Sequence, residues 1–165
     1  MPAEMQAVIV VKMLGYDRAL RARAGASIEI GVVYDPQHEE STRVHAQVLA
    51  AFKKLESKTV RGTGVTAEAH AFSGAGHLRE WVTASGIDVI YVAPGLAREL
   101  PSIRAMCRER KIASVTSVRA LVEGGVAVGV VVAGRNPRLL VNLAAARESG
   151  MDLDAKLLHL SELVR

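Results

Sequence analysis

The hydrophobic positions alternate along the chain between short β-branched runs and longer segments with helical spacing. Two of the short runs, Ile28–Tyr34 and Ile87–Ala93, are almost wholly apolar, which is typical of central strands buried on both faces. Asp35-Pro36 and Pro94-Gly95 end these two runs. Similar patterns predict two further strands, Ala67–Phe72 and Ala113–Val118.

Amphipathic segments separate these strands. Ser41 or Thr42 can cap a helix in which apolar side chains recur at helical spacing, namely Val44, Val48, Ala51, Phe52 and Leu55. A second helix carries Leu78, Trp81 and Val82, and a third runs from about Ala97 to Arg110. The repeated order of strand and helix predicts parallel strands joined by right-handed crossovers.

The end of the chain predicts an antiparallel hairpin and short helices. Val126–Ala133 and Leu139–Leu143 flank Gly134-Arg135-Asn136-Pro137, which has the composition of a tight turn. A helix over Ala144–Ser149 and a final helix from Asp154 complete the chain. We therefore expect one domain over residues 1–165, a three-layer Rossmann-like α/β sandwich with a mostly parallel sheet and a C-terminal antiparallel hairpin.

The first segment supports two interpretations. Val8–Val11 has strand propensity, but Ile9, Met13, Tyr16 and Leu20 fall on one helical face. We predict a helix because the helical periodicity is longer than the β-branched patch. An apolar arc on this helix is wider than one small domain covers, so we expect it to contact a second copy or a partner protein. The residues of this arc are Met5, Val8, Ile9 and Met13.

Composition narrows the classes of protein. Half of the 165 residues are hydrophobic and 4% are aromatic, so the chain is not disordered and its core is aliphatic. The net charge of +4 is modest and basic residues alternate with acidic ones, so we expect no nucleic-acid partner. The apolar run Ala7–Val11 is too short for a membrane span or an export signal. The Met-Pro-Ala start is compatible with an export signal that was removed.

The candidate chemical groups do not converge. The histidines are scattered, and none forms a metal-type pair with a third ligand, so they suggest surface or structural roles. His70 and His77 flank a glycine-rich loop and can approach each other, which leaves a metal site there as a weak alternative. Cys107 is the single cysteine, so no intrachain disulfide is available and we expect a buried, inert thiol. We predict no catalytic residue, no metal and no cofactor.

A small molecule, if one binds, would lie at the carboxyl ends of the parallel strands. Ser73-Gly74-Ala75-Gly76 precedes a helix, where free amides can hold an anion, but its spacing is not that of a phosphate loop or a dinucleotide fingerprint. A helix cap and turn is the plainer interpretation of this loop. The candidate rim residues are Asp35, Ser73, Gly74, Gly76, Pro94, Gly95 and Ser117.

A series of residues in the C-terminal third resembles the YfiR family. Gly124-Gly125-Val126 precedes the hairpin, Leu140–Ala146 reads Leu-Val-Asn-Leu-Ala-Ala-Ala, and Gly150-Met151 is followed by Lys156-Leu157-Leu158. Physically, the glycines allow a sharp turn and Asn142 can satisfy backbone groups of the turn after its strand. The layout of elements matches over nearly the whole chain, whereas motif identity is confined to this third.

The resemblance implies a periplasmic, usually dimeric protein that binds and represses the sensor part of a membrane-bound diguanylate cyclase. Better-known members use paired cysteines for redox control, which Cys107 alone cannot provide. Our leading hypothesis is a non-enzymatic regulator that docks on the extracytoplasmic domain of a membrane signalling protein and forms a homodimer. A lone free thiol also fits the cytosol. The alternatives are a small-molecule binding domain resembling one lobe of a periplasmic substrate-binding protein, and an enzyme of unrecognised type.

Overall fold

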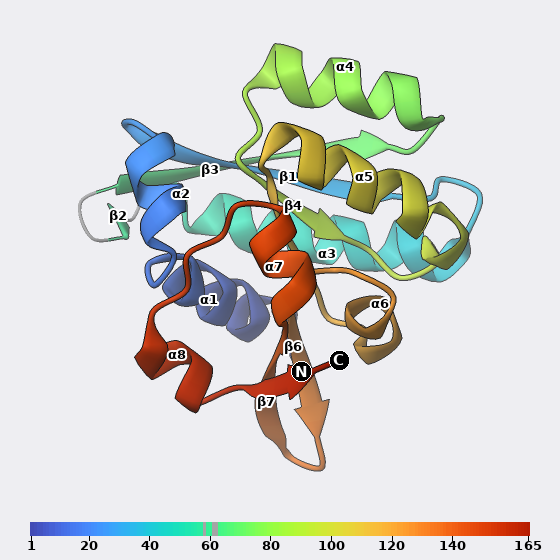
Figure 1. The fold of residues 1–165 in the computed structure, drawn as a ribbon. Helices are drawn as coiled ribbons and strands as arrows, with labels where there is room; N and C mark the ends of the chain where they lie inside the picture. Colours follow the sequence, from blue (N-terminus) through green and yellow to red (C-terminus); the bar gives the residue numbers. More distant parts are fainter. Residues whose placement is uncertain (58, 61–62) are drawn as a thin grey trace.

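A mixed β-sheet runs through the centre of the molecule, with helices on both of its faces (Figure 1). The computed structural model describes residues 1–57, 59–60 and 63–165. Within these residues the sheet has eight strands in the order β2-β3-β1-β4-β5-β6-β7-β8. The strands are β1 (Ser27–Tyr34), β2 (Thr59–Val60), β3 (Thr63–Ala71), β4 (Val89–Val92), β5 (Ala113–Thr116), β6 (Val128–Ala133), β7 (Asn136–Asn142) and β8 (Glu162–Val164).

The helices connect the strands and cover the sheet. They are α1 (Ala3–Leu14), α2 (Arg18–Arg23), α3 (Glu39–Lys54), α4 (Ala75–Ser85), α5 (Leu100–Arg110), α6 (Arg119–Glu123), α7 (Leu143–Glu148) and α8 (Ala155–His159). A 3-10 turn over Ala97–Glu99 precedes α5. None of the described helices combines the length and the hydropathy that crossing a bilayer requires.

The middle of the sheet is parallel and its two ends are mixed. β3, β1, β4, β5 and β6 run in one direction, and β7 returns antiparallel to β6. At the two ends of the sheet, β2 is antiparallel to β3 and β8 is parallel to β7. This topology confirms the predicted Rossmann-like sandwich with its C-terminal antiparallel hairpin.

Two aliphatic cores form because side chains alternate between the faces of each strand. Ile30 and Val32 of β1 lie in the core beneath α1 and α3, and Val33 lies in the core beneath α4 and α5. All four residues of β4 are buried, as the apolar run predicts for a central strand. Each fully buried aliphatic side chain contributes about 1.5–3 kcal/mol relative to an exposed one.

The predicted strands in the middle of the chain are confirmed, with longer or shorter bounds. The run Ala67–Phe72 corresponds to β3, which begins earlier, at Thr63. Gly62 and Gly64 have the composition of a loop in the sequence, but Gly64 belongs to the start of β3 and Gly62 lies outside the described residues. The first segment is helical as far as Leu14, whereas Tyr16 of the predicted helical face lies in a turn and Leu20 belongs to α2.

The C-terminal end differs from the prediction in two respects. The expected final helix from Asp154 ends at His159, where the Ser161 hydroxyl donates to the Leu157 carbonyl, and the chain continues as β8 along β7. Asn136 and Pro137 belong to β7 rather than to the turn, because the β-branched run of β6 continues to Ala133 and pairs with them. The paired strands therefore extend closer to the turn than predicted, while β6 begins two residues later, at Val128, and β8 forms this edge of the sheet.

Candidate functional site

The parallel register brings the predicted rim residues to one edge of the sheet. Tyr34 at the end of β1 pairs with Ala71 of β3, and Val92 of β4 pairs with Thr116 of β5. Asp35, Ser73, Pro94-Gly95 and Ser117 follow the ends of these four neighbouring strands. The topology thus gathers these residues as expected, and ligand binding at this rim stays a prediction.

The Asp35 side of the rim is engaged in local contacts. The Asp35 carboxylate accepts a hydrogen bond from the Gln37 amide at 2.9 Å, and the Asp35 amide donates to the Ser41 hydroxyl at 2.9 Å. His38 caps α3 by accepting from the Ser41 amide, and its ring covers Gly95, where an added Cβ would lie 2.8 Å from the ring. His38 thus lies at the rim, although in the sequence it is one of the scattered histidines. A side chain three residues before Ser41 can cap a helix by accepting from the Ser41 amide, and this spacing is the signal that could have located His38 at the rim.

The glycine-rich loop is the open part of the rim. Gly74 has a φ of +122°, which favours glycine, and a Cβ added at Gly74 or Gly76 would meet no described atom within 4 Å. The Ser73 hydroxyl lies 2.9 Å from Nδ1 of His77 in the first turn of α4. The positive φ at position 74 explains why a glycine stands there. The free space beside Gly74 and Gly76 is compatible with a ligand.

Ser117 lies beside a buried hydroxyl. The Tyr91 hydroxyl donates to Oε1 of the buried Gln6 at 2.7 Å, and a hydrogen bond with Ser117 acts to lower the Tyr91 pKa. Burial raises the pKa of Tyr91 to about 12, so this phenol stays protonated at neutral pH. The contacts join α1 to β4 and favour a structural role for Ser117.

His70 and Trp81 form a stacked pair on the α4 side of β3. Their ring centroids are 4.6 Å apart and the planes differ by 14°. Within the described chain, the buried Nε2 of His70 has no hydrogen-bond partner. Burial and the nearby His77 lower the pKa of His70, while Glu68 acts in the opposite direction. No third metal-ligating side chain joins the two histidines among the described residues.

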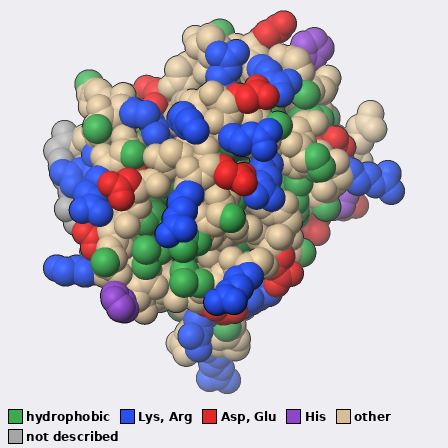
Figure 2. Space-filling view, viewed as in Figure 1, with side chains coloured by type: hydrophobic (Ala, Val, Ile, Leu, Met, Phe, Trp, Pro, Cys, Tyr) green, Lys and Arg blue, Asp and Glu red, His purple; other side chains and the backbone are tan. Residues whose placement is uncertain are grey.

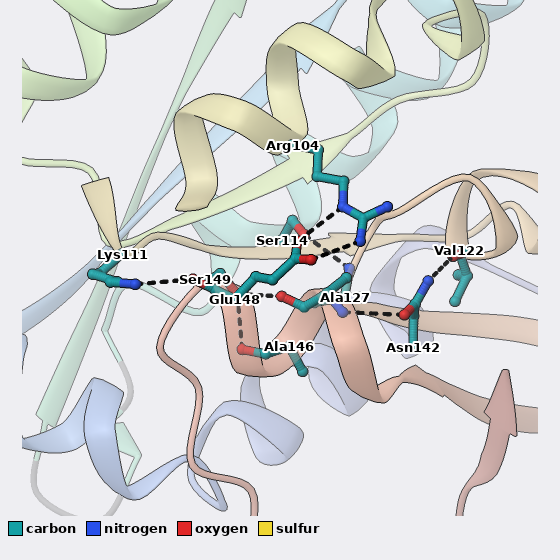
Figure 3. Close-up of polar contacts among 10 residues, drawn as sticks. Arg104, Lys111, Ser114, Val122, Ala127, Asn142, Ala146, Glu148 and Ser149 are labelled. Carbon is teal, nitrogen blue, oxygen red and sulfur yellow. Dashed lines mark hydrogen bonds and ion pairs between the residues drawn. The ribbon is translucent and has the colours of Figure 1, made fainter. Parts of the chain in front are cut away.

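Asn142 is the buried polar residue that organises the C-terminal third (Figure 3). Its side-chain oxygen accepts from the Ala145 amide at 3.1 Å and so caps α7. Its side-chain nitrogen donates to the Val122 carbonyl at 2.9 Å, at the end of α6. The predicted structural role is confirmed, and it extends to α6 as well. Of the two glycines that follow α6, Gly125 has the positive φ, +125°, and Gly124 allows close contact with Leu100.

An ion pair joins α5 to α7 beside this cap (Figure 3). Arg104 donates two hydrogen bonds of 3.0 Å to the Glu148 carboxylate, which lower the pKa of that carboxyl. Lys111 donates to the Glu148 backbone carbonyl at 3.0 Å. Both side chains of the Arg104–Glu148 pair are about one-third exposed, so the pair orients the helices more than it stabilises them.

Cys107 belongs to α5, and it is buried on the side of that helix that packs against the core, with 3% of its surface exposed. Burial raises the pKa of its thiol to about 12, and a hydrogen bond with Ser114 acts in the opposite direction. The thiolate, which is the reactive form, is therefore scarce at neutral pH. The geometry is that of an inert core thiol.

The predicted face of the first helix is narrower than expected. Met5 and Val8 are exposed, Ile9 is half-buried, and Met13 is buried in the core. The inclusion of Met13 in a partner surface was wrong, because α1 lies over the sheet and beside α3, so two of its sides are covered. Met5 and Val8 alone supply only a small part of the area of about 800 Å² per partner in a stable interface.

Four surface pockets of about 210–400 Å³ lie away from the rim. One of about 310 Å³ lies at the opposite edge of the sheet and is lined by Arg23, Asp88, Arg110 and Lys111 among others. Burial raises the pKa of the Asp88 carboxyl there. None of these four pockets contains a rim residue.

Comparison with solved structures finds the same fold within longer chains. An ABC domain in complex with L-Trp from Streptococcus pneumonia superposes with a TM-score of 0.69 at 18% identity over 99% of this chain and 60% of that one. A conserved domain protein from Vibrio cholerae gives 0.66 at 14% identity, with coverage of 99% and 60%. An open, ligand-free substrate-binding protein with adhesive properties from Clostridium difficile gives 0.60 at 18%, with coverage of 88% and 57%. The chain spans about 60% of these structures, and such identities establish the fold alone.

Family comparison is more specific. No curated protein matches the chain. The model of the YfiR/HmsC-like family matches residues 3–162. This match covers nearly all of the chain, from α1 to the start of β8, and includes the hairpin and the Asn142 cap. The chain therefore belongs to the YfiR/HmsC-like family.

Proposed function

We propose that this protein is a non-enzymatic periplasmic regulator that binds and represses a membrane-bound diguanylate cyclase. Family membership over residues 3–162 carries the proposal and supports a regulatory role in general. The site geometry is in line with recognition: the rim side chains hold helix starts and turns, and the Cys107 thiol is buried. The partner would be the extracytoplasmic domain of the cyclase, and homodimer formation stays part of the proposal.

The experiment is a measurement of cyclic di-GMP in cells. We expect cyclic di-GMP to rise when the gene for this protein is deleted and to return to its original level when the exported protein is supplied. A version that is retained in the cytoplasm serves as the control and should not restore repression. Unchanged cyclic di-GMP in the deletion strain would contradict the proposal.

A second candidate function is small-molecule binding at the rim. The open space above Gly74 and Gly76 and the likeness to substrate-binding proteins favour it. If this function is correct, a metabolite that raises the melting temperature of the protein binds at the rim. Calorimetry should then show weaker binding of that metabolite to Ser73→Ala, because the variant lacks the hydroxyl group at the start of the glycine-rich loop. Equal binding by the wild type, Ser73→Ala and Ser117→Ala would rule out the rim as the ligand site.

A further inference from the structure

The exposed apolar side chains gather at one end of the sheet. Six large ones are exposed within the described residues: Met1, Met5, Val8, Val132, Leu160 and Leu163. They belong to α1 and the two residues before it, to β6, and to the α8–β8 segment. β6, β7 and β8 are neighbours in the sheet, and α1 packs against β6. The distribution is therefore one-sided, whereas scattered single residues would need no explanation.

The strand alternation places these side chains on the same face of the sheet as α1. Val128 and Val130 of β6 lie in the core beneath α1, so Val132 continues that row beyond the helix. Pro137 pairs with Val132, and Leu163 pairs with Val141, which also lies in that core. We call Val132, Pro137 and Leu163 the hairpin face. Val132 and Pro137 are exposed because no described helix covers the tip of the hairpin, and Leu163 is exposed on β8 at the edge of the sheet.

The hairpin is also a projecting, basic arm. Residues 132–138 are exposed on both faces, and the hairpin extends beyond the body of the molecule (Figures 1 and 2). Arg135 at the turn and Arg138 are its only charged residues, and Lys or Arg side chains are visible on the projection in Figure 2. Neither arginine forms an ion pair within the described residues, although Arg138 is near enough to Glu162, the partner of Arg119, to help lower the pKa of that carboxyl. The arm thus joins an apolar side to a positively charged turn and strand.

We propose that the arm inserts into a cleft of the regulated membrane protein, with an apolar wall against the hairpin face and carboxylates against Arg135 and Arg138. This inference rests on the proposed function and names the surface that carries it. Charge complementarity of this kind speeds association and selects the partner. Met5 and Val8 on α1 lie on the same side of the sheet and extend the contact.

A second copy of this chain is a poor occupant. A two-fold interface uses the same patch on both subunits, so it would bring two basic arms into one interface. A copy would instead need an acidic cleft to receive the arm. Each of the four described pockets contains at least as many basic as acidic residues, and the one lined by Arg23, Arg110 and Lys111 is clearly basic.

The test measures binding of the full chain to the purified extracytoplasmic domain of the cyclase that it represses. We expect Arg135→Glu/Arg138→Glu and, separately, Val132→Asp to weaken binding about tenfold or more. The control Arg21→Glu/Arg43→Glu makes the same change of net charge on the exposed surfaces of α2 and α3 and should bind as the wild type does. Arg135→Gln/Arg138→Gln, which only removes the charges, should weaken binding less and reduce its salt dependence. Thermal melts confirm that each variant is folded.

The outcomes separate this inference from the proposed function. If the wild type binds and both hairpin variants bind equally well, the inference is wrong and the proposed function stands. If the wild type does not bind, both are wrong. If light scattering shows a dimer at micromolar concentration that Val132→Asp dissociates, a second copy occupies the hairpin face, and the inference is again wrong.

Discussion

Asn142→Ala is expected to lower the free energy of unfolding by about 1.5–2.5 kcal/mol. The side chain makes two buried hydrogen bonds, one to the Ala145 amide and one to the Val122 carbonyl. Loss of the helix cap costs about 1 kcal/mol, because the Ala145 amide loses its acceptor. Loss of the bond to Val122 costs about 0.5–1.5 kcal/mol more, because this buried carbonyl keeps the Gly125 amide as a donor at 3.1 Å.

Urea unfolding followed by circular dichroism measures this loss, and two variants divide it. Asn142→Asp keeps the acceptor for the Ala145 amide but presents a carboxylate to the Val122 carbonyl, so it should be at least as unstable as the alanine variant. Asn142→Ser keeps a cap and should be intermediate. Asn136→Ala, in the exposed part of the hairpin, is the matched control and should change stability by less than about 0.5 kcal/mol. A loss in Asn142→Ala as small as that of the control would refute the structural role.

The two central strands and the Asn142 cap could be predicted because their causes are local. The apolar runs of β1 and β4 leave no face for solvent, and an asparagine between a strand and an alanine-rich helix is at a capping position. In contrast, β8 has three residues and no pattern of its own. It is a strand because β7 offers Leu140–Asn142 as a partner, and that is a property of the tertiary fold.

The same distinction, between features with local causes and features that depend on tertiary packing, applies to the candidate surfaces. Periodicity predicted that α1 is apolar over a wide arc, but it could not say that α3 and the sheet would cover Met13 and leave Met5 exposed. The rim followed from the order of strands and helices, whereas the contact of His38 with Gly95 depends on how the start of α3 folds over β4. The sequence could not predict the hairpin face, because Val132 continues the apolar run of β6 without a break. Only the packing of α1 shows that the helix covers Val128 and Val130 and leaves Val132 exposed.

Gly31→Ala is expected to destabilise the protein by about 1–3 kcal/mol, although alanine is the smallest possible addition. A Cβ at this position of β1 would lie 2.3 Å from Cη2 and 2.9 Å from Cζ3 of Trp81, and 3.2 Å from the Ile87 side chain. The indole ring is stacked on His70, so it can yield only by giving up that contact and uncovering β1. Glycine at this position in a central strand is therefore explained by the approach of the ring, not by backbone conformation.

A double-mutant cycle with Trp81→Leu tests this cause directly. Because leucine does not reach β1, Gly31→Ala should cost nothing or add stability in that background, where the strand gains a side chain at no steric cost. Gly76→Ala is the control in the first part of α4, since no described atom lies within 4 Å of its Cβ, and it should be neutral or stabilise by up to about 1 kcal/mol. If Gly31→Ala is equally costly with leucine at position 81, then Ile87 or the sheet itself opposes the methyl group. In that case the stack of Trp81 on His70 does not determine which residue β1 can accept there.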